Sequence, residues 1–380
     1  MRQSAIVALV NQYCEAPARF SYVERPQPPL PTHSVEIAVS AVSVNPLDLL
    51  MASGYGRRIF GLGAGGRLPL QLGRDGSGVV TRVGTRVCHL QPGMAVWFGL
   101  PPFRRGSYAT HIQIDSALAS PAPAELTATQ SASLPYAGVT ALRLLEAAGL
   151  DERQARGRRV FIHGASGGIG LVLLDLLHAW GATVFVSAAP AVFDALKGRA
   201  PCTCFNSRTD EIMRGIAECD TLLDLVASHD ARFSIERRFI ETLPAGGRYA
   251  TPVTPVPDIV DETGLVSGLV RSGLYRHQAM RAAARREIDY RWVFFKPGAA
   301  RLDALATSIS RGFLSTPPLS TYGFRALSAA HDAARQSPHL GKIVVQVSAG
   351  GSEPIFSSNV NGARASRIPP RVIADGAERQ

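Results

Sequence analysis

Lysine is nearly absent from this chain, and that scarcity shapes how its charge is interpreted. Of the 40 basic residues among 380, only Lys197, Lys296 and Lys342 are lysines, so 37 are arginines. The formal net charge is +10, but the arginines are spread along the sequence, and their densest stretch, 271–291, also contains acidic residues. This pattern indicates a compositional bias rather than a basic patch, so we predict no specific nucleic-acid partner. The positive balance favours an anionic ligand such as a dinucleotide.

Cysteine is also scarce. Five cysteines are an odd number in a chain of this length, which argues against a fold built on disulfides. Cys202 and Cys204 are separated by one residue, too close for an ordinary zinc knuckle, and no second pair accompanies them. We interpret them as small apolar residues of a strand and expect a reducing compartment.

Long apolar runs are missing as well. No apolar run reaches the roughly 18 residues that a membrane-spanning helix needs, so the sequence predicts no transmembrane segment. The apolar stretch 6–10 is too short for a secretory signal, and no Arg- and Ser-rich presequence is visible. The chain does contain 46% apolar residues, which is enough for real cores and, at this length, for two domains.

The order of secondary structure divides the chain near residue 125. Residues 1–125 are rich in strand patterns, such as the period-two alternation over 35–42, and glycine and proline interrupt them often. Thr127, with Gln130 three residues on, predicts the start of a helix that continues through Leu145. Over 126–299 strands alternate with helices, which predicts a doubly wound α/β domain with a parallel sheet. Residues 252–289, rich first in proline and then in arginine, are expected to be an excursion from that sheet. A final strand is expected over 343–347. The polar segment 349–380 has no periodicity, so we predict a disordered tail.

A glycine-rich loop carries the strongest functional signal. Residues 164–170 read Gly-Ala-Ser-Gly-Gly-Ile-Gly, and the loop follows a predicted strand and opens a predicted helix. Glycines allow a tight turn and a close approach of the backbone to a pyrophosphate, while the helix N-terminus offers free N–H groups to the anion. A structural turn without a ligand is the alternative. The candidate cofactor-binding residues of the loop are Gly164, Ser166, Gly167, Gly168 and Ile169.

The choice between NAD and NADP stays open at this level. An acidic residue at the end of the second strand of the domain binds the ribose of NAD, and residues 187–190 contain none. They contain no Arg or Lys for a 2′-phosphate either, so Lys197 or Lys342 would have to reach it from elsewhere.

Several motifs together resemble a known family. The segments that carry the likeness are residues 45–56, 72–80, 96–102, 132–136, 164–170 and 290–295. With the β-rich first part and the returning last strand, they resemble the medium-chain dehydrogenase/reductases, in the zinc-independent quinone oxidoreductase branch and specifically the mitochondrial reticulon-4-interacting protein 1 family. The likeness spans about residues 5–348.

The resemblance implies an architecture and an activity. A GroES-like substrate domain, 1–125 completed by 300–348, would enclose a Rossmann domain at 126–299. The implied activity is NADPH-dependent hydride transfer to a quinone or enone in mitochondria; without that likeness a cytoplasmic location would be expected. No metal site is expected, because the cysteines and histidines of the first part are too scattered for zinc. A homodimer and protein partners stay open.

The same resemblance implies particular site residues. Asn45 and Tyr55 would line the nicotinamide and substrate pocket as catalytic residues, where an amide and a phenol can donate hydrogen bonds to a developing enolate. Turn formation and packing between glycines are the alternatives for these two. Trp292 and Phe294 either wall the nicotinamide or belong to a hydrophobic strand. Gly341 and Lys342 match part of a C-terminal cofactor-binding motif.

Some positions depart from the family pattern. Leu340 stands where the family usually has Arg, Ser207 where a Tyr is expected, and 189–190 where a Ser is usual. A lost charge-assisted hydrogen bond costs about 1.5–3 kcal/mol, so cofactor binding could be much weakened. A catalytically idle member that acts through protein partners is therefore the alternative to an enzyme.

Overall fold

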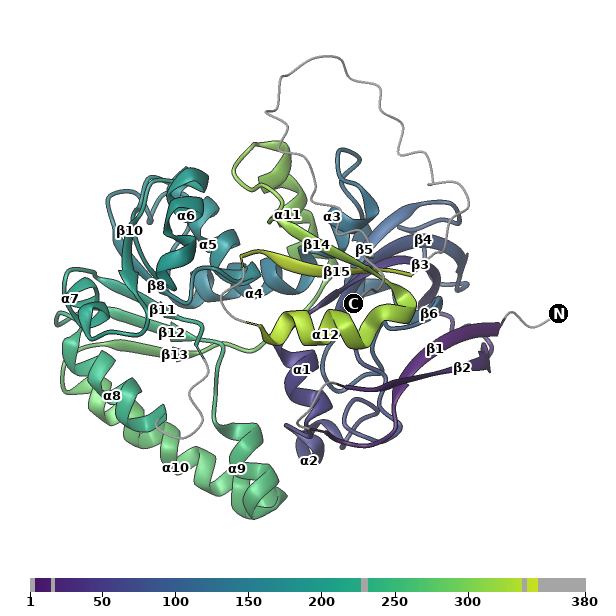
Figure 1. The fold of residues 1–380 in the computed structure, drawn as a ribbon, viewed down its shortest axis with the longest axis horizontal. Coiled ribbons are helices and arrows are strands. Elements are labelled where there is room, and N and C mark those ends of the chain that lie inside the picture. Colours follow the sequence, from purple (N-terminus) through teal and green to yellow (C-terminus); the bar gives the residue numbers. More distant parts are fainter. Residues whose placement is uncertain (1–3, 15–17, 227–231, 337–339, 348–380) are drawn as a thin grey trace, which may run out of the picture.

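Two large β-sheets of different construction and a separate two-stranded sheet form the β-structure of the described residues (Figure 1). The computed structural model describes residues 4–14, 18–226, 232–336 and 340–347. The predicted tail at 349–380 therefore lies outside the described residues. No helix in these ranges is both long enough and apolar enough to cross a bilayer.

The first sheet joins the two ends of the chain. Its strands are, in spatial order, β14 (Leu319–Gly323), β15 (Lys342–Gln346), β3 (Ser34–Val44), β4 (Asp75–Val83), β5 (Ala95–Gly99) and β7 (Ala119–Pro121), with β6 (His111–Asp115) paired to β3. A separate hairpin is formed by β1 (Ser4–Val10) and β2 (Phe20–Pro26). Because β15 runs antiparallel to β3, with Val345 opposite Val42, the C-terminal strand completes a sheet that the N-terminal part begins.

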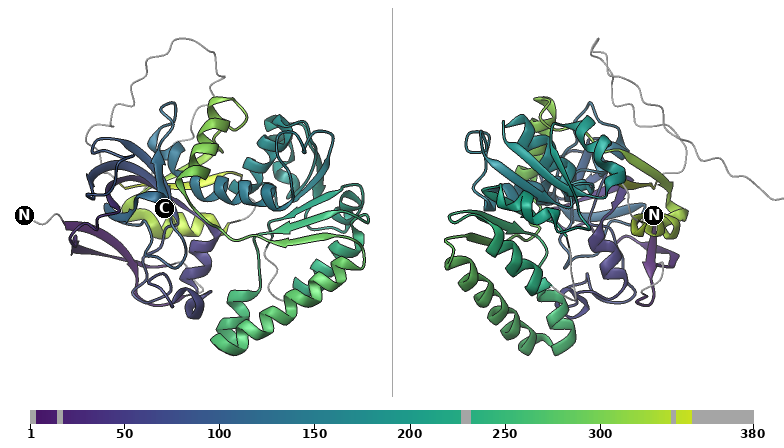
Figure 2. Two further views of the ribbon diagram at one scale, coloured as in Figure 1. Left: turned by 180° about the vertical axis from the view of Figure 1, so that it is seen from behind. Right: turned by 60° about the vertical axis from the view of Figure 1, so that its left-hand side comes forward.

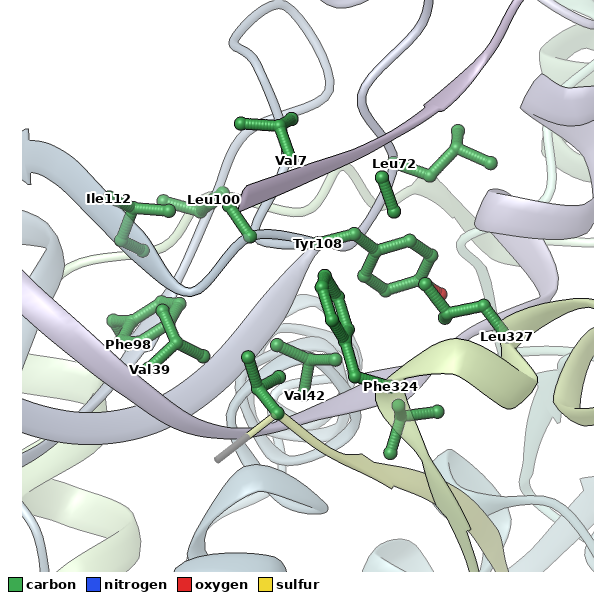
Figure 3. Close-up of a cluster of buried hydrophobic side chains, with 14 of the residues drawn as sticks. Val7, Val39, Val42, Leu72, Phe98, Leu100, Tyr108, Ile112, Phe324 and Leu327 are labelled. Atoms are coloured by element: carbon green, nitrogen blue, oxygen red, sulfur yellow. The ribbon is translucent and has the colours of Figure 1, made fainter. Parts of the chain in front are cut away.

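The core beside this sheet gathers apolar side chains from both ends of the chain. Figure 3 shows Val42 of β3 close to Phe324 from the C-terminal part, while Val39 lies beside Phe98. The opposite face of β3 is also covered, since Ala41 packs against Ala132. Strand β3 is consequently more buried than its period-two pattern predicts.

The second sheet is parallel throughout. Its strands are, in spatial order, β10 (Thr203–Asn206), β9 (Thr183–Ala188), β8 (Arg159–His163), β11 (Thr221–Asp224), β12 (Arg248–Thr251) and β13 (Asp289–Trp292). In chain order this is 3-2-1-4-5-6, the doubly wound arrangement, whose ligand crevice lies where the order reverses. That point falls between β8 and β11. The predicted fold class, a β-rich GroES-like domain with a Rossmann domain, is confirmed.

Helices and short 3₁₀ turns connect and cover these strands. They are α1 (Pro46–Ala52), α2 (Arg57–Phe60), η1 (Ser116–Leu118), α3 (Ala128–Ala132), α4 (Pro135–Ala147), α5 (Gly168–Ala179), η2 (Pro190–Val192), α6 (Phe193–Arg199), α7 (Glu211–Ala217), α8 (Arg232–Thr242), α9 (Val256–Thr263), α10 (Leu265–Ala284), α11 (Ala299–Ser310), η3 (Phe324–Ala326) and α12 (Leu327–Arg335).

The predicted helix start at Thr127 is confirmed. The Thr127 hydroxyl accepts from the Gln130 N–H at 3.3 Å, and the Gln130 side chain accepts from the Thr127 N–H at 2.9 Å. The expected single helix is nevertheless two, α3 and α4. Pro135 has no N–H with which to continue α3, and it begins the new helix instead.

Residues 252–289 form an excursion from the parallel sheet, as predicted. Helices α9 and α10 make a hairpin along the outer side of that half of the molecule (Figures 1 and 2). Helix α10 packs on α8 and β13, while α9 reaches α2 near the other sheet. The hairpin therefore touches both halves of the protein.

Candidate active site

A buried polar cluster lies where the two sheets approach each other. The Lys342 ammonium, on the first residue of β15, donates to the Asn45 side-chain oxygen at 2.5 Å and to the Val44 carbonyl at 3.3 Å. The Asn45 amide nitrogen in turn donates to the Asp75 carboxylate at 3.0 Å. All three polar side chains are buried. The fold thus joins two predicted site residues that are almost 300 positions apart in the sequence.

Asp75 anchors this cluster. Its carboxylate accepts from the Ser43 hydroxyl at 2.6 Å and from the Tyr136 N–H, in the first turn of α4, at 3.0 Å. Burial raises the pKa of Asp75, and the nearby charge of Lys342 and the hydrogen bonds oppose that shift. Burial lowers the pKa of Lys342, and Asp75 opposes that shift in turn. The two charges therefore support each other through Asn45.

A second buried pair holds the backbone of Asn45. The Asp48 carboxylate accepts from the Asn45 N–H at 3.0 Å and from the Gly73 N–H at 2.8 Å. Arg74 lies 3.7 Å from it and donates to two backbone carbonyls of the 101–104 loop. Burial raises the pKa of Asp48 to about 6. Asp48 and Arg74 position the cluster and do not belong to it.

The glycine loop meets β15 directly. The Gly341 N–H donates to the Ser166 carbonyl at 3.1 Å, and Gly167 and Gly341 form a parallel bridge. A Cβ on Gly168 would lie 2.6 Å from Cδ of Lys342, whereas one on Gly167 would have no atom within 4 Å. Four predicted cofactor-binding residues, Ser166, Gly167 and Gly168 of the loop and Gly341 just before β15, therefore lie next to the polar cluster.

The loop also has the geometry of a phosphate-binding turn. Gly164 has a φ of +93°, a conformation that favours glycine. A Cβ on Gly170 would lie 2.5 Å from Cα of Ala165, so the helix packs closely on the loop. Ile169 is partly buried in the core beneath. Helix α5 begins at Gly168 and directs its free N–H groups toward the crevice.

A cavity of about 620 Å³ opens beside this loop, at the carboxyl ends of the central strands. Its walls include Gly164 and Ser166 from the loop, Ser187 from β9 and Asp224 from β11. Its position, polar lining and open glycine loop fit the adenosine half of a dinucleotide.

Arginine side chains line this cavity where none was predicted. Arg208 follows β10 and Arg238 lies on α8, and both contribute to the wall. The Arg238 guanidinium donates to Asp210 at 2.9 Å, while that of Arg208 has no hydrogen-bond partner among the described residues. Sequence reasoning looked for a basic residue after the second strand, whereas the basic residue that lines the cavity follows the third. An Arg two residues beyond a short strand was the available signal.

Tyr55 lies in a loop that helix α9 holds in place. Gly54 and Gly56 on either side have φ values of +100° and +71°. The Asp261 carboxylate, on α9, accepts from the Gly56 N–H at 2.5 Å and from the Arg58 N–H at 2.9 Å. The half-buried Tyr55 ring is 6.4 Å from that of Phe60. The two flanking glycines thus allow the turn that presents Tyr55.

Tyr136 is a second phenol near the cluster, and sequence reasoning assigned it no role. Its ring lies 4.5 Å from that of Phe295. Burial raises the pKa of Tyr136 above its usual range, and Asp48, Tyr55 and Asp75 add to that shift. Tyr136 therefore stays protonated and shares the electrostatic environment of Tyr55.

Trp292 and Phe294 are not brought to the polar cluster by any described contact. The Trp292 indole donates to the Tyr290 hydroxyl, and its ring lies 6.1 Å from that of Tyr275 on α10. The Phe294 side chain is 56% exposed. The next residue, Phe295, is the one whose ring lies beside Tyr136.

Metal-ligating side chains do not cluster in the part of the chain that the structure describes. No group of three or more His, Cys, Asp or Glu side chains there could hold a metal ion. We predict that purified protein contains no stoichiometric zinc and that a chelator leaves any catalytic activity unchanged. Elemental analysis tests this, with a protein known to be free of zinc as the control. One zinc per chain would contradict the prediction.

The fold and the site together define a class. A strand-rich domain completed by the chain's last strand, a 3-2-1-4-5-6 parallel sheet and a glycine loop facing a crevice between them are the features of medium-chain dehydrogenase/reductases. Residues 31–124 match the alcohol dehydrogenase GroES-like domain, and residues 203–345 match the family described as zinc-binding dehydrogenase.

Known proteins give a narrower assignment. The chain is 30% identical to the mitochondrial NAD(P)H oxidoreductase RTN4IP1 of Mus musculus, over 83% of this chain and 82% of that protein. It is also 30% identical to the mitochondrial reticulon-4-interacting protein 1 of Caenorhabditis elegans, over 86% and 92%. The chain belongs to this family of NAD(P)H oxidoreductases.

Solved structures share the fold. The quinone oxidoreductase of Coxiella burnetii superposes with a TM-score of 0.76 at 23% identity, covering 91% of this chain and all of that one. The CurK enoyl reductase superposes with a TM-score of 0.74 at 20% identity, over 90% and 99%.

Proposed function

We propose that the chain is an NADPH-dependent, zinc-independent reductase of quinones or enones. The observation that carries the proposal is the junction of the glycine loop with the buried Lys342–Asn45–Asp75 cluster. The Lys342 ammonium of this cluster is a hydrogen-bond donor next to the loop that would bind the pyrophosphate of the dinucleotide.

The proposed preference of the protein for NADPH over NADH is supported by an arginine in the cavity wall. Arg208 has no partner among the described side chains and lines the adenosine half of the crevice. A guanidinium recognises a phosphate dianion through charge-assisted, often bidentate hydrogen bonds. Arg208 thereby compensates for the missing basic residue after β9.

In this proposal the cofactor supplies the hydride, and side chains of the protein stabilise charge and return the proton. When bound, the nicotinamide supplies hydride to an electron-poor carbon of the substrate. The Lys342 ammonium, which has one N–H beyond those given to Asn45 and Val44, donates to the oxygen on which negative charge develops. The Asn45 amide gives its own N–H bonds to Ser43 and Asp75, so it positions the ammonium. Tyr55 or solvent returns the proton. No step needs a metal ion.

A mitochondrial location is part of this proposal. It is supported by the names of the relatives, which are described as mitochondrial.

The alternative is a catalytically idle member that acts through a protein partner. The departures at 189–190, Ser207 and Leu340 favour it, because each removes an expected cofactor contact. The two functions differ in one measurement. An enzyme oxidises NADPH in the presence of a small quinone, whereas the idle member does not.

Replacing Arg208 with alanine is expected to raise the KM for NADPH by about 10–100-fold and to leave the KM for NADH nearly unchanged. The reason is the loss of a charge-assisted hydrogen bond worth about 1.5–3 kcal/mol to a phosphate that only NADPH carries. Steady-state kinetics with both nucleotides measures it. Arg237→Ala is the control, since that side chain is exposed, pairs with Glu241 and does not line the cavity. Equal losses with both nucleotides would remove Arg208 from cofactor selection.

Replacing Tyr55 with phenylalanine is expected to lower kcat by about 10²-fold, within the range for lost acid–base catalysis. KM should change little, because the phenol bond strengthens mainly in the transition state. Assays with NADPH and a small quinone measure this. Tyr136→Phe is the matched variant, since it keeps the ring beside Phe295. A loss confined to Tyr136→Phe would transfer the role to Tyr136, and an unchanged kcat in Tyr55→Phe would exclude Tyr55 from the chemistry.

A further inference from the structure

Two surface segments of the strand-rich domain, residues 57–68 and 101–105, pack against each other and form what we call the arginine patch. The Phe103 carbonyl accepts from the Ala64 N–H at 2.9 Å and from the Gly65 N–H at 3.1 Å. The first segment contains α2, which lies beside α9 at the lower edge of the molecule in Figure 1. Segments that are separate in the sequence therefore share one surface.

Glycines allow the close packing of the two segments. A Cβ on Gly63 would lie 2.2 Å from the Phe103 carbonyl oxygen. A Cβ on Gly65 would lie 1.7 Å from the Pro102 carbonyl oxygen. Any larger residue at these positions would push the segments apart, so the fold holds the patch as a single unit.

The arginine patch exposes large apolar side chains to solvent. Leu62 is 62% exposed, Phe103 is 42% exposed and Leu68 is 40% exposed. On the inner side, the buried ring of Phe60 lies 5.4 Å from that of Phe103 and holds it in place. Large apolar side chains gathered on one surface indicate an interaction site.

The patch is also strongly basic. Neither segment contains an acidic residue. Two of its five arginines each give one N–H to a backbone carbonyl, and none of the five forms an ion pair with a carboxylate among the described residues. All five are exposed: Arg57, Arg58, Arg67, Arg104 and Arg105. Folding gathers these charges, which the even spread of arginine along the sequence conceals.

Acidic side chains of α9 lie near one end of the patch but do not neutralise it. The Asp261 carboxylate accepts from two backbone N–H groups, those of Gly56 and Arg58. Glu262 is exposed and pairs with no arginine in the part of the chain that the structure describes. The guanidinium groups of the patch are therefore available to an external anion.

The mixture of charge and apolar surface decides which anion fits. A nucleic acid or an acidic protein would satisfy the arginines and leave Leu62 and Leu68 in water. A phospholipid surface satisfies both, because its phosphates accept from guanidinium groups while apolar side chains enter the boundary with the acyl chains. We propose that the arginine patch docks this protein on the surface of an anionic phospholipid membrane. The patch begins directly after the turn that presents Tyr55, so docking holds that turn at the membrane.

Vesicle flotation of the full-length chain tests the charges. The protein should float with vesicles of phosphatidylcholine and phosphatidylglycerol but not with phosphatidylcholine alone, and added salt should weaken the binding. Each arginine near an anionic surface contributes about fivefold to binding, so the double change Arg104→Glu and Arg105→Glu should lower the partition coefficient about 25-fold or more. The control is Arg156→Glu with Arg158→Glu, the same change of charge at two exposed residues just before β8. Equal losses in both double variants, or a wild-type chain that does not float with the anionic vesicles, would overturn the proposal.

A second variant tests the apolar part of the contact. Leu62→Ser should lower the partition coefficient about threefold, because less apolar surface then leaves water on docking. The side chain is 62% exposed, so the variant should keep the wild-type Tm. If Leu62→Ser binds vesicles as the wild type does while the Arg104 and Arg105 double variant does not, the membrane is overturned in favour of a polyanionic partner such as a nucleic acid or an acidic protein.

Discussion

Replacing Gly167 with valine is expected to abolish the thermal stabilisation of the protein by NADPH. At a nucleotide concentration about 100 times Kd, binding stabilises the folded state by about 2.7 kcal/mol, or about 5–10 °C in Tm. A valine at this position places its side chain where the backbone should approach the pyrophosphate. The apo protein should keep its Tm, because a Cβ there meets no atom within 4 Å and the φ of −81° suits any residue. Thermal-shift titration with NADPH and NADH measures both effects.

Gly168→Val is the informative comparison for that experiment. This variant should also lose NADPH binding, because its side chain too would stand where the backbone should approach the pyrophosphate. The structure shows that its side chain would also meet Lys342, whose Cδ would lie 2.6 Å from the new Cβ. The variant should therefore disturb the polar cluster as well and lower the apo Tm. If Gly167→Val keeps the wild-type NADPH shift, the loop does not bind the nucleotide.

Replacing Asp75 with alanine is expected to cost about 3–5 kcal/mol in the free energy of unfolding, as breaking a buried charge pair does. The substitution leaves the Lys342 charge without its counterpart. It also leaves the Ser43, Asn45 and Tyr136 donors without their acceptor. Urea denaturation at neutral pH measures the loss.

A double-mutant cycle separates this cluster from ordinary packing. Asp75→Ala with Lys342→Met should cost less than the two single changes added together, by about 0.5–3 kcal/mol, because it removes both charges. Asp289→Ala serves as the control, since its pair with Arg291 is exposed and worth at most about 1 kcal/mol. Strict additivity of the two buried substitutions would show that the charges are not coupled.

The two experiments address different parts of the protein. The Gly167→Val experiment concerns the glycine loop, whose function is predicted from the sequence alone. The second concerns a cluster whose members come from the start of β4, the turn before α1 and the start of β15. A chain that retains the cluster but fails to bind either nucleotide would favour the idle alternative.

Local patterns in the sequence by themselves determined much of the architecture. The strand, glycine loop and helix at 159–179 follow from apolar runs and glycine spacing, and Thr127 and Gln130 fix a helix start through a capping box. These features depend on residues within a few positions of each other. That is why sequence reasoning reached them.

Tertiary structure alone decided which residues share the site. The sequence could propose Asn45 and Lys342 separately, but only the pairing of β15 with β3 places the ammonium against the amide. The tertiary structure also places Phe295 beside Tyr136 and brings Arg208 into the cavity wall. The physical reason is that a buried charge must find its partners in space, and loop closure lets those partners lie anywhere along the chain.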